Sequence, residues 1–215
     1  MNRCDCPSEL DEARLEPVLA EETPRNRGLV ILGMETGLRV SELIGLKVGD
    51  VWQGGAAARH LRITRSRMKG GQGAHRRAVR GRTVPLNAKA IAALEEMLRG
   101  LSAPGDGPLF PSREGQGTSI TRRQALRVIK KIFLAAGCDP SRVWGSHSLR
   151  RRFVRRVFDR TRDINVTRAA AGHRWISTTQ AYLDLAGEAA EAAILAMGRS
   201  TPLSNGQQDL PRQVG

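Results

Sequence analysis

Apolar residues recur every three to four positions along most of the chain, which is the spacing of an amphipathic helix. The first such segment follows Ser8, a favourable N-cap residue, and places Leu10, Leu15, Val18 and Leu19 on one side. The run of apolar residues from 28 to 34 predicts a helix that is buried all round. The predicted helices cover residues 9–22, 24–34, 38–46, 87–101, 120–136, 146–160, 165–171, 177–185 and 188–197.

A different pattern lies between the third and fourth of these helices. Residues 50–52, 60–64 and 79–86 are short segments rich in β-branched residues, and glycine-containing segments separate them. They predict a three-stranded antiparallel meander. The chain is therefore expected to be mainly α with this one small sheet, as a single domain over residues 9–197. Residues 1–8 are expected to be an N-terminal extension and residues 198–215 a flexible C-terminal tail.

Two of the predicted helices have features that bear on function. The arginine-rich segment 146–160 has a buried stripe made of Leu149, Phe153, Val157 and Phe158. The helix predicted over 177–185 begins with Ser177 and Gln180, which have the spacing of a capping box.

Charge changes the picture, because the net charge of +14 is concentrated in two segments. Residues 59–82 hold eight Arg, one Lys and no acidic residue, and residues 142–174 hold ten Arg against two Asp. These segments carry +9 and +8, so the rest of the chain carries 14 − 17 = −3. Two basic segments on a mildly acidic remainder predict a surface that binds a polyanion, and double-stranded DNA is the expected partner. The arginines expected to contact DNA are Arg62, Arg65, Arg67, Arg76, Arg77, Arg151 and Arg155.

Several classes of protein are not expected. No run of apolar residues is long enough to span a membrane, and the basic segments lack the bulky apolar residues of an interfacial helix. The three cysteines cannot form a disulfide framework, and Cys4 and Cys6 are expected to be spare thiols. No metal-binding cluster and no phosphate-binding G-x-x-x-x-G-K-[ST] loop occur, so neither a metal ion nor a nucleotide cofactor is expected. The expected location is the cytoplasm, at the nucleoid.

Three short motifs bring chemically useful residues together. Arg39 and Glu42 lie three positions apart on a predicted helix, so that the carboxylate can orient the guanidinium. His147 and Arg150 have the same spacing and are expected to face outward together, because Leu149 points into the core. His173 precedes the helix that carries the one tyrosine among 215 residues, Tyr182.

In their order and separations, the motifs TGLRVSELIGLKVGDV, HSLRRRF and AGHRWISTTQAYL resemble those of the tyrosine recombinase (phage integrase) family. The resemblance covers about residues 10–186 and implies the helical catalytic domain of that family. It also implies the active-site residues. These are Arg39, His147, Arg150, His173, the nucleophile Tyr182 and, in the hairpin between the second and third strands, Lys69.

The chemistry of DNA cleavage suits these residue types. Arg39 and Arg150 would hold a phosphodiester as permanently charged donors, while Tyr182 forms a 3′-phosphotyrosyl bond. Lys69 is the expected general acid for the 5′-oxygen, and His147 would accept or relay the tyrosine proton. His173 would donate a hydrogen bond to a non-bridging oxygen. By resemblance, four copies act on two DNA sites, with a second recombinase or a DNA-bending protein as possible partners.

Two departures leave alternatives open. About 30 residues precede the first motif, so the N-terminal DNA-binding domain of most members is expected to be absent. Arg151 also stands where many members have histidine. A type IB topoisomerase uses similar residues, and a recombinase-derived accessory protein would bind DNA without cleaving it. RNA binding is disfavoured because the basic segments lack interleaved aromatic residues.

Overall fold

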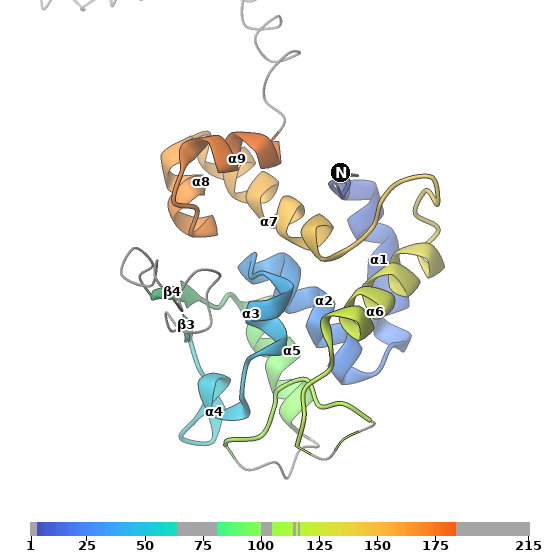
Figure 1. Ribbon diagram of the computed structural model, residues 1–215, viewed down its shortest axis with the longest axis vertical. Helices are drawn as coiled ribbons and strands as arrows, with labels where there is room; N and C mark the ends of the chain where they lie inside the picture. The colour runs from blue at the N-terminus through green and yellow to red at the C-terminus, as the bar shows by residue number, and fades with distance from the viewer. Residues whose placement is uncertain (1–3, 64–80, 100–104, 114, 116, 184–215) are drawn as a thin grey trace, which may run out of the picture. The chain divides into compact units, whose positions relative to one another are not determined.

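Helices dominate the computed structural model, which describes residues 4–63, 81–99, 105–113, 115 and 117–183 (Figure 1). The helices are α1 (Glu9–Glu21), α2 (Pro24–Thr36), α3 (Val40–Ile44), α4 (Val48–Val51), α5 (Ala88–Leu98), α6 (Arg122–Ala135), α7 (Ser146–Thr161), α8 (Ile164–Ala171) and α9 (Ile176–Leu183). The strands are β1 (Trp52–Gln53), β2 (Ala56–Ala57), β3 (His60–Ile63) and β4 (Arg82–Pro85). The mainly α fold class is confirmed. The helix expected over 188–197 and the tail at 198–215 lie outside the described residues.

Capping side chains explain where several helices begin. The Ser8 hydroxyl accepts the Asp11 N–H of α1 at 3.1 Å, and Asp11 accepts the Ser8 N–H in return at 2.9 Å. Thr121 and Gln124 form the same reciprocal arrangement at the start of α6. The capping box predicted at Ser177 is wrong. α9 begins at Ile176, because the Thr178 N–H already bonds to the Trp175 carbonyl at 3.2 Å, and Ser177 therefore lies within the first turn.

The predicted meander is replaced by two separate two-stranded antiparallel sheets. β3 pairs with β4, from His60 opposite Pro85 to Ile63 opposite Arg82. β1 instead pairs with β2, and no third strand joins β3 and β4 within the described part of the chain. The reason is a tight turn at Gly54 and Gly55, where positive φ angles of 59° and 82° fold the chain back on itself at once.

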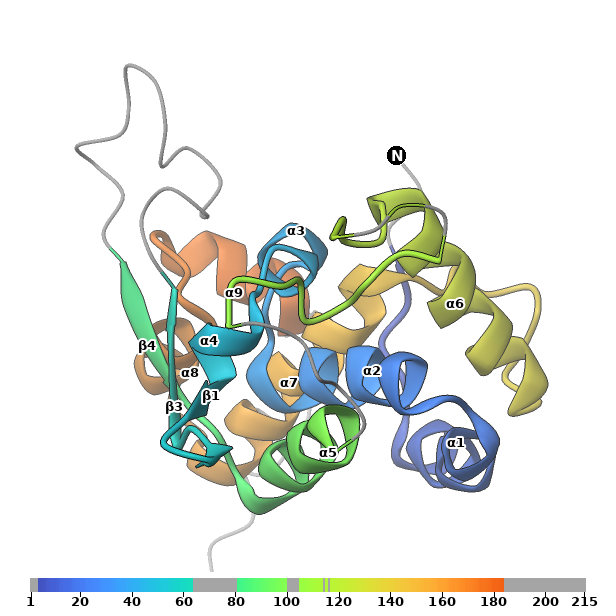
Figure 2. The ribbon, with the colours of Figure 1, turned by 90° about the horizontal axis from the view of Figure 1, so that it is seen from below.

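The core is built around α2, which packs against α5 and α7 (Figure 2). Leu29 and Val30 of α2 are fully buried, as the apolar run predicts. On α1, Leu15 and Leu19 are buried, whereas Leu10, which was expected on the same side, is 61% exposed. No helix in the described ranges has the length and apolar character needed to cross a bilayer.

The arginine-rich helix α7 is tied to α1 and α2 by buried ion pairs. Arg152 Nε lies 2.6 Å from Glu12 Oε2, and Arg156 Nη1 lies 2.8 Å from Glu35 Oε1. Leu149 and Val154 face the core, while Phe153, Val157 and Phe158 of the predicted stripe are only half-buried. The ion pairs fix α7 with Leu149 directed at α2, where its side chain lies against Gly33.

Candidate active site

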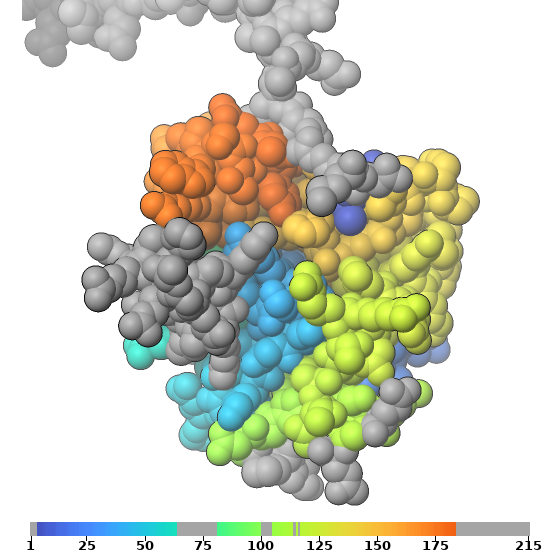
Figure 3. Space-filling model, viewed as in Figure 1, coloured from blue at the N-terminus to red at the C-terminus, as the bar shows by residue number. Residues whose placement is uncertain are grey.

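Tyr182 and His147 lie in contact although 35 positions separate them in sequence. Tyr182 is half-buried in α9, and its hydroxyl lies 2.8 Å from Nδ1 of His147, in the first turn of α7. The His173 ring centroid lies 5.1 Å from that of Tyr182, and Arg150 Cζ lies 5.8 Å from the tyrosine ring centroid. Three of the residues expected to form an active site therefore surround the phenol of a fourth, Tyr182. In the space-filling view, the orange surface of α8 and α9 lies next to the blue surface around α3 (Figure 3).

Arg150 lies beneath the tyrosine and not on the surface. Its side chain is 1% exposed, and its guanidinium donates to the Ala171 carbonyl at 2.7 Å and to the Gly37 carbonyl. The expectation that His147 and Arg150 face outward together is therefore wrong, because only His147 is exposed. Burial, and then the positive charge of Arg39, lowers the Arg150 pKa to about 10, which leaves it charged at neutral pH. Its Nε–H finds no acceptor among the described residues.

Arg39 is held by Glu42, as their spacing predicts. Arg39 is the N-cap of α3, and its backbone N–H donates to Glu42 Oε2 at 2.8 Å. Its Nη1 donates to Glu42 Oε1 at 3.1 Å, while 29% of the arginine side chain stays exposed. A buried carboxylate therefore fixes a guanidinium whose other donors remain open to a ligand.

His173 is a buried histidine with one free ring nitrogen. The residue is 4% exposed, and its Nδ1 lies 3.0 Å from the Thr179 hydroxyl oxygen. Its Nε2 is buried and has no hydrogen-bond partner in the part of the chain that the structure describes. Burial, followed by the positive charges of Arg150, Arg39 and Arg82, lowers its pKa to about 3. His173 is thus a neutral imidazole at physiological pH.

Arg82 belongs to this group and was missed from the sequence. Its Nη2 lies 3.5 Å from Glu42 Oε2, and its Nη1 donates to the Ala170 carbonyl at 3.3 Å. It is one of eight arginines in residues 59–82, and nothing in the pattern of that segment separates it from the others. The signal that remained was its place within the strand predicted over 79–86, where one side chain in two faces inward.

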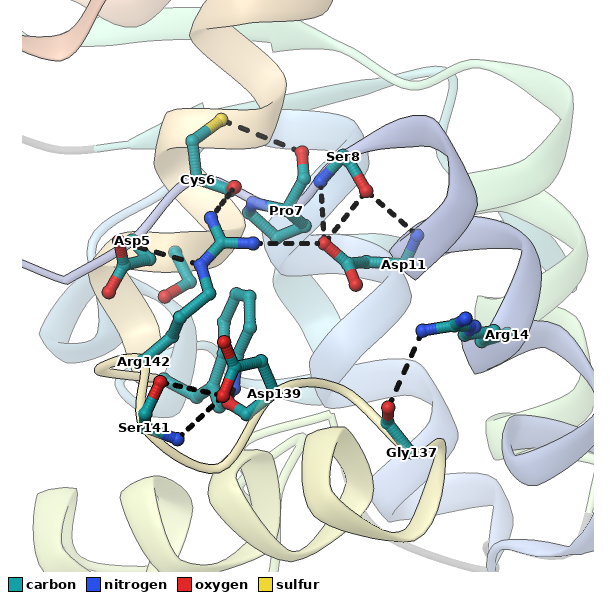
Figure 4. Close-up of polar contacts among 12 residues, drawn as sticks. Asp5, Cys6, Pro7, Ser8, Asp11, Arg14, Gly137, Asp139, Ser141 and Arg142 are labelled. Carbon is teal, nitrogen blue, oxygen red and sulfur yellow. Dashed lines mark hydrogen bonds and ion pairs between the residues drawn. The ribbon is translucent and has the colours of Figure 1, made fainter.

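The start of α7, which carries His147, is anchored by the N-terminal segment (Figure 4). The Asp5 N–H donates to the Val143 carbonyl at 2.9 Å, and the Val143 N–H donates to Asp5 Oδ2 at 2.7 Å. Arg142 Nη2 donates to the Cys6 carbonyl at 2.9 Å, and Arg142 Nη1 donates to Asp11 at 3.4 Å. Residues 5–11 thus hold the loop from which α7 starts. Both Cys4 and Cys6 are free thiols.

The arginines expected to contact DNA differ in position. Arg62 is exposed on β3, and Arg155 is exposed and paired with Asp159 at 3.0 Å. Arg151 is only 7% exposed, so its position in this structure does not suit a phosphate contact. Lys69, Arg65, Arg67, Arg76 and Arg77 lie outside the described residues.

No group of three or more His, Cys, Asp or Glu side chains within the described ranges is arranged to hold a metal ion. The polar groups that surround Tyr182 are mainly nitrogen donors. Such a site suits an anion and not a cation.

A family model described as the phage integrase family matches residues 10–188. The chain belongs to the phage integrase family. It is 30% identical over 193 residues to the tyrosine recombinase XerD of Proteus mirabilis, a match that covers 85% of this chain and 56% of that protein. It is 33% identical over 167 residues to XerC of Pseudomonas entomophila, covering 75% of this chain and 48% of that protein. The chain thus spans about half the length of these curated relatives.

Solved structures place the fold among the tyrosine recombinases. The crystal structure of XerA recombinase matches with a TM-score of 0.70 and 25% identity, over 94% of this chain and 67% of that one. A post-cleavage complex of XerH recombinase bound to its palindromic difH substrate matches with a TM-score of 0.67 and 24% identity, over 91% of this chain and 54% of that one. The family resemblance drawn from the three motifs is therefore confirmed.

Proposed function

We propose that this chain carries the catalytic centre of a site-specific DNA recombinase, which cleaves and rejoins strands through a 3′-phosphotyrosyl intermediate. The observation that carries the proposal is the 2.8 Å approach of the Tyr182 hydroxyl to His147 Nδ1, beside a buried guanidinium. A phenol next to a base has a route for losing its proton, and a nearby arginine favours attack on an anionic phosphodiester.

The proposed step balances as a transesterification. The Tyr182 oxygen bonds to phosphorus, and its proton passes to His147. The bond between phosphorus and the 5′-oxygen breaks, and that oxygen takes a proton from Lys69. No oxidant, nucleotide or metal ion is consumed, because the phosphotyrosyl ester keeps the energy of the broken bond for rejoining to another 5′-end.

Donors without partners support a phosphate as the ligand. Within the described part of the chain, the Arg150 Nε–H is buried without an acceptor, and His173 Nε2 is buried without a hydrogen-bond partner. A buried donor without an acceptor costs roughly 1–3 kcal/mol, and such groups in one site need an explanation. The positive charges of Arg39, Arg82 and Arg150 each lower the pKa of His173, so these groups act on one small region. A phosphodiester there would supply both charge and acceptors.

Double-stranded DNA and several copies of the chain complete the proposal. XerH has been solved bound to difH DNA, and an integrase of transposon Tn1549 in complex with circular intermediate DNA. By analogy, we infer that this chain acts as four copies on two DNA sites, with strand exchange between them. Exposed Arg62, and Arg65, Arg67, Arg76 and Arg77 beyond it in sequence, are the proposed phosphate contacts.

The test is capture of the covalent intermediate. The chain is incubated with a pool of nicked duplexes that carry a randomised site, and protein–DNA adducts that resist denaturant are isolated. The wild-type chain should form adducts. Tyr182→Phe should form none and should keep its affinity for the selected DNA within about twofold, because phosphate contacts elsewhere supply most of the affinity. Adducts that persist in Tyr182→Phe, or that never form with the wild-type chain, would contradict the proposal.

A further inference from the structure

Arg82 joins three elements that meet at the proposed active site. It lies in the first position of β4, and its side chain is 12% exposed. Its guanidinium reaches Glu42 of α3 at 3.5 Å and the Ala170 carbonyl of α8 at 3.3 Å. A side chain that bridges a strand and two helices limits how those elements move relative to one another.

The turn that carries His173 lies against this guanidinium. Gly172 ends α8 with a φ of 63°, in the left-handed region that favours glycine. A Cβ added at Gly172 would lie 2.4 Å from Arg82 Nη1 and 2.8 Å from Arg82 Cδ. Glycine is therefore needed here twice, once for the backbone angle and once for the close approach of Arg82. His173, the next residue, is consequently placed by the same contact.

Burying the Arg82 guanidinium costs free energy, because a charge is removed from water. Burial lowers the Arg82 pKa, and Glu42 raises it only in part. Glu42 also serves Arg39, so one buried carboxylate is shared by two guanidiniums. A buried guanidinium that shares its counter-charge, and whose Nη groups hold α3 and α8, points to a positioning role.

We propose that Arg82 is a positioning residue: it acts through His173, by fixing the turn that carries this histidine beside Tyr182. The effect of Arg82 on catalysis rests on the proposed function. The structural part of the inference, the hold on the Gly172–His173 turn, stands on the contacts alone. The two parts can therefore be tested separately.

The structural part is tested by a double-mutant cycle in unfolding. Arg82→Ala removes the three atoms nearest to a Cβ at position 172, and Gly172→Ala introduces that Cβ. In the double variant the loss of melting temperature should be smaller than the sum of the two single losses by at least about 2 °C. Losses that simply add would overturn the proposal.

A second readout needs neither DNA nor Arg82→Ala, should that variant fail to fold. Arg82→Lys keeps a positive charge but loses the planar fork that serves two acceptors. The imidazole nitrogen resonances of His173 should shift in this variant. The same substitution at Arg99, an exposed residue at the end of α5, is the control and should leave them in place. Unchanged His173 resonances in Arg82→Lys would overturn the proposal.

The catalytic part is tested by the rate of adduct formation under single-turnover conditions. Arg82→Lys should lower this rate at least tenfold, since misplacement of a reacting group by about 1 Å can cost ~100-fold. Affinity for the same DNA should change less than twofold. In a His173→Asn background the further effect of Arg82→Lys should fall below about threefold, because residues that act as a unit are not additive. A full tenfold loss in that background would show that Arg82 does not act through His173.

The outcomes distinguish the two proposals. If the wild-type chain forms no adduct, the recombinase proposal fails, while the unfolding cycle and the His173 resonances still decide whether Arg82 holds the turn. If adducts form and both structural readouts are unchanged, the positioning role fails and the proposed function stands.

Discussion

The low pKa of His173 makes the stability of the fold depend on pH in a way that one substitution should remove. The imidazole is 4% exposed, and Arg150, Arg39 and Arg82 all oppose its protonation. Its pKa in the folded state is about 3, whereas the pKa of a histidine in an unfolded chain is about 6.5.

The sign follows from counting protons. Between about pH 6.5 and the folded pKa of about 3, the unfolded chain binds a proton at His173 and the folded chain does not. Acid therefore favours unfolding over this window. From pH 7 to pH 5 this histidine alone should lower the free energy of unfolding by about 2 kcal/mol, because the slope approaches ~1.4 kcal/mol per pH unit below the unfolded pKa.

Urea unfolding at pH 7 and pH 5 measures the effect, in the wild-type chain and in His173→Asn. Carboxylates also lose stabilising interactions in acid. Burial raises the pKa of Glu35, but its pairing with Arg156 outweighs this effect and leaves the pKa lowered. The contribution of the carboxylates cancels when the two proteins are compared. The drop between pH 7 and pH 5 should be about 2 kcal/mol smaller in His173→Asn. The same replacement at exposed His60 is the control and should keep the wild-type drop. Equal drops in the wild-type chain and His173→Asn would refute the burial of a neutral imidazole.

Two further predictions concern the supports of the site. Glu42→Gln removes the carboxylate shared by Arg39 and Arg82. Because both guanidiniums lose their counter-ion, the free energy of unfolding measured in urea titrations should fall by about 3 kcal/mol. A loss under ~1 kcal/mol would contradict this prediction. Arg142→Met removes the hydrogen bonds to the Cys6 carbonyl and to Asp11. The amide hydrogen of Val143 should then exchange faster with solvent. An unchanged exchange rate would show that the N-terminal segment is held without Arg142.

Local chemistry explains which parts of the fold were predictable. Ser8 was predicted to cap the first helix, and it does so in the structure, as Asn87 and Thr121 do at α5 and α6. Their signals act over three or four residues, so a single sequence displays them. The pairing of strands depends on which of several segments, some far apart in sequence, each strand meets. The hairpin at Gly54 and Gly55 closes on itself before the chain reaches β3, and the β-branched pattern alone did not reveal it.

The spacing of motifs predicted which side chains lie together, but not how deeply each is buried. Helical spacing correctly brought Arg39 to Glu42, and the three motifs brought His147 and Tyr182 into one site. Whether Arg150 is exposed depends on the Gly37 and Ala171 carbonyls, which lie 113 and 21 positions away. No local pattern reports such contacts.

The prediction from charge needs correction at two arginines, for a related reason. The arginines of residues 142–174 were counted as a DNA-binding surface, yet Arg152 and Arg156 of α7 are paired with Glu12 and Glu35. Those acids belong to the mildly acidic remainder of the chain. Basic and acidic residues that lie in separate parts of the sequence therefore neutralise each other in the fold. Part of the basic excess therefore builds the helix that carries the catalytic candidates, and is not left to attract DNA.

Among the described residues, the cations around Tyr182 lack an equal counter-charge. There, Arg39 and Arg82 share Glu42, and Arg150 is bonded to carbonyls only. Burying cations without equal counter-charge is costly, and a fold tolerates it only when other contacts over-determine the site. The ion pairs of α7, the Asp5–Val143 bonds and the apolar contacts of α2 supply that rigidity. Under the proposed function, the phosphodiester then brings the missing charge, and its binding energy acts at the atoms where the bond is broken.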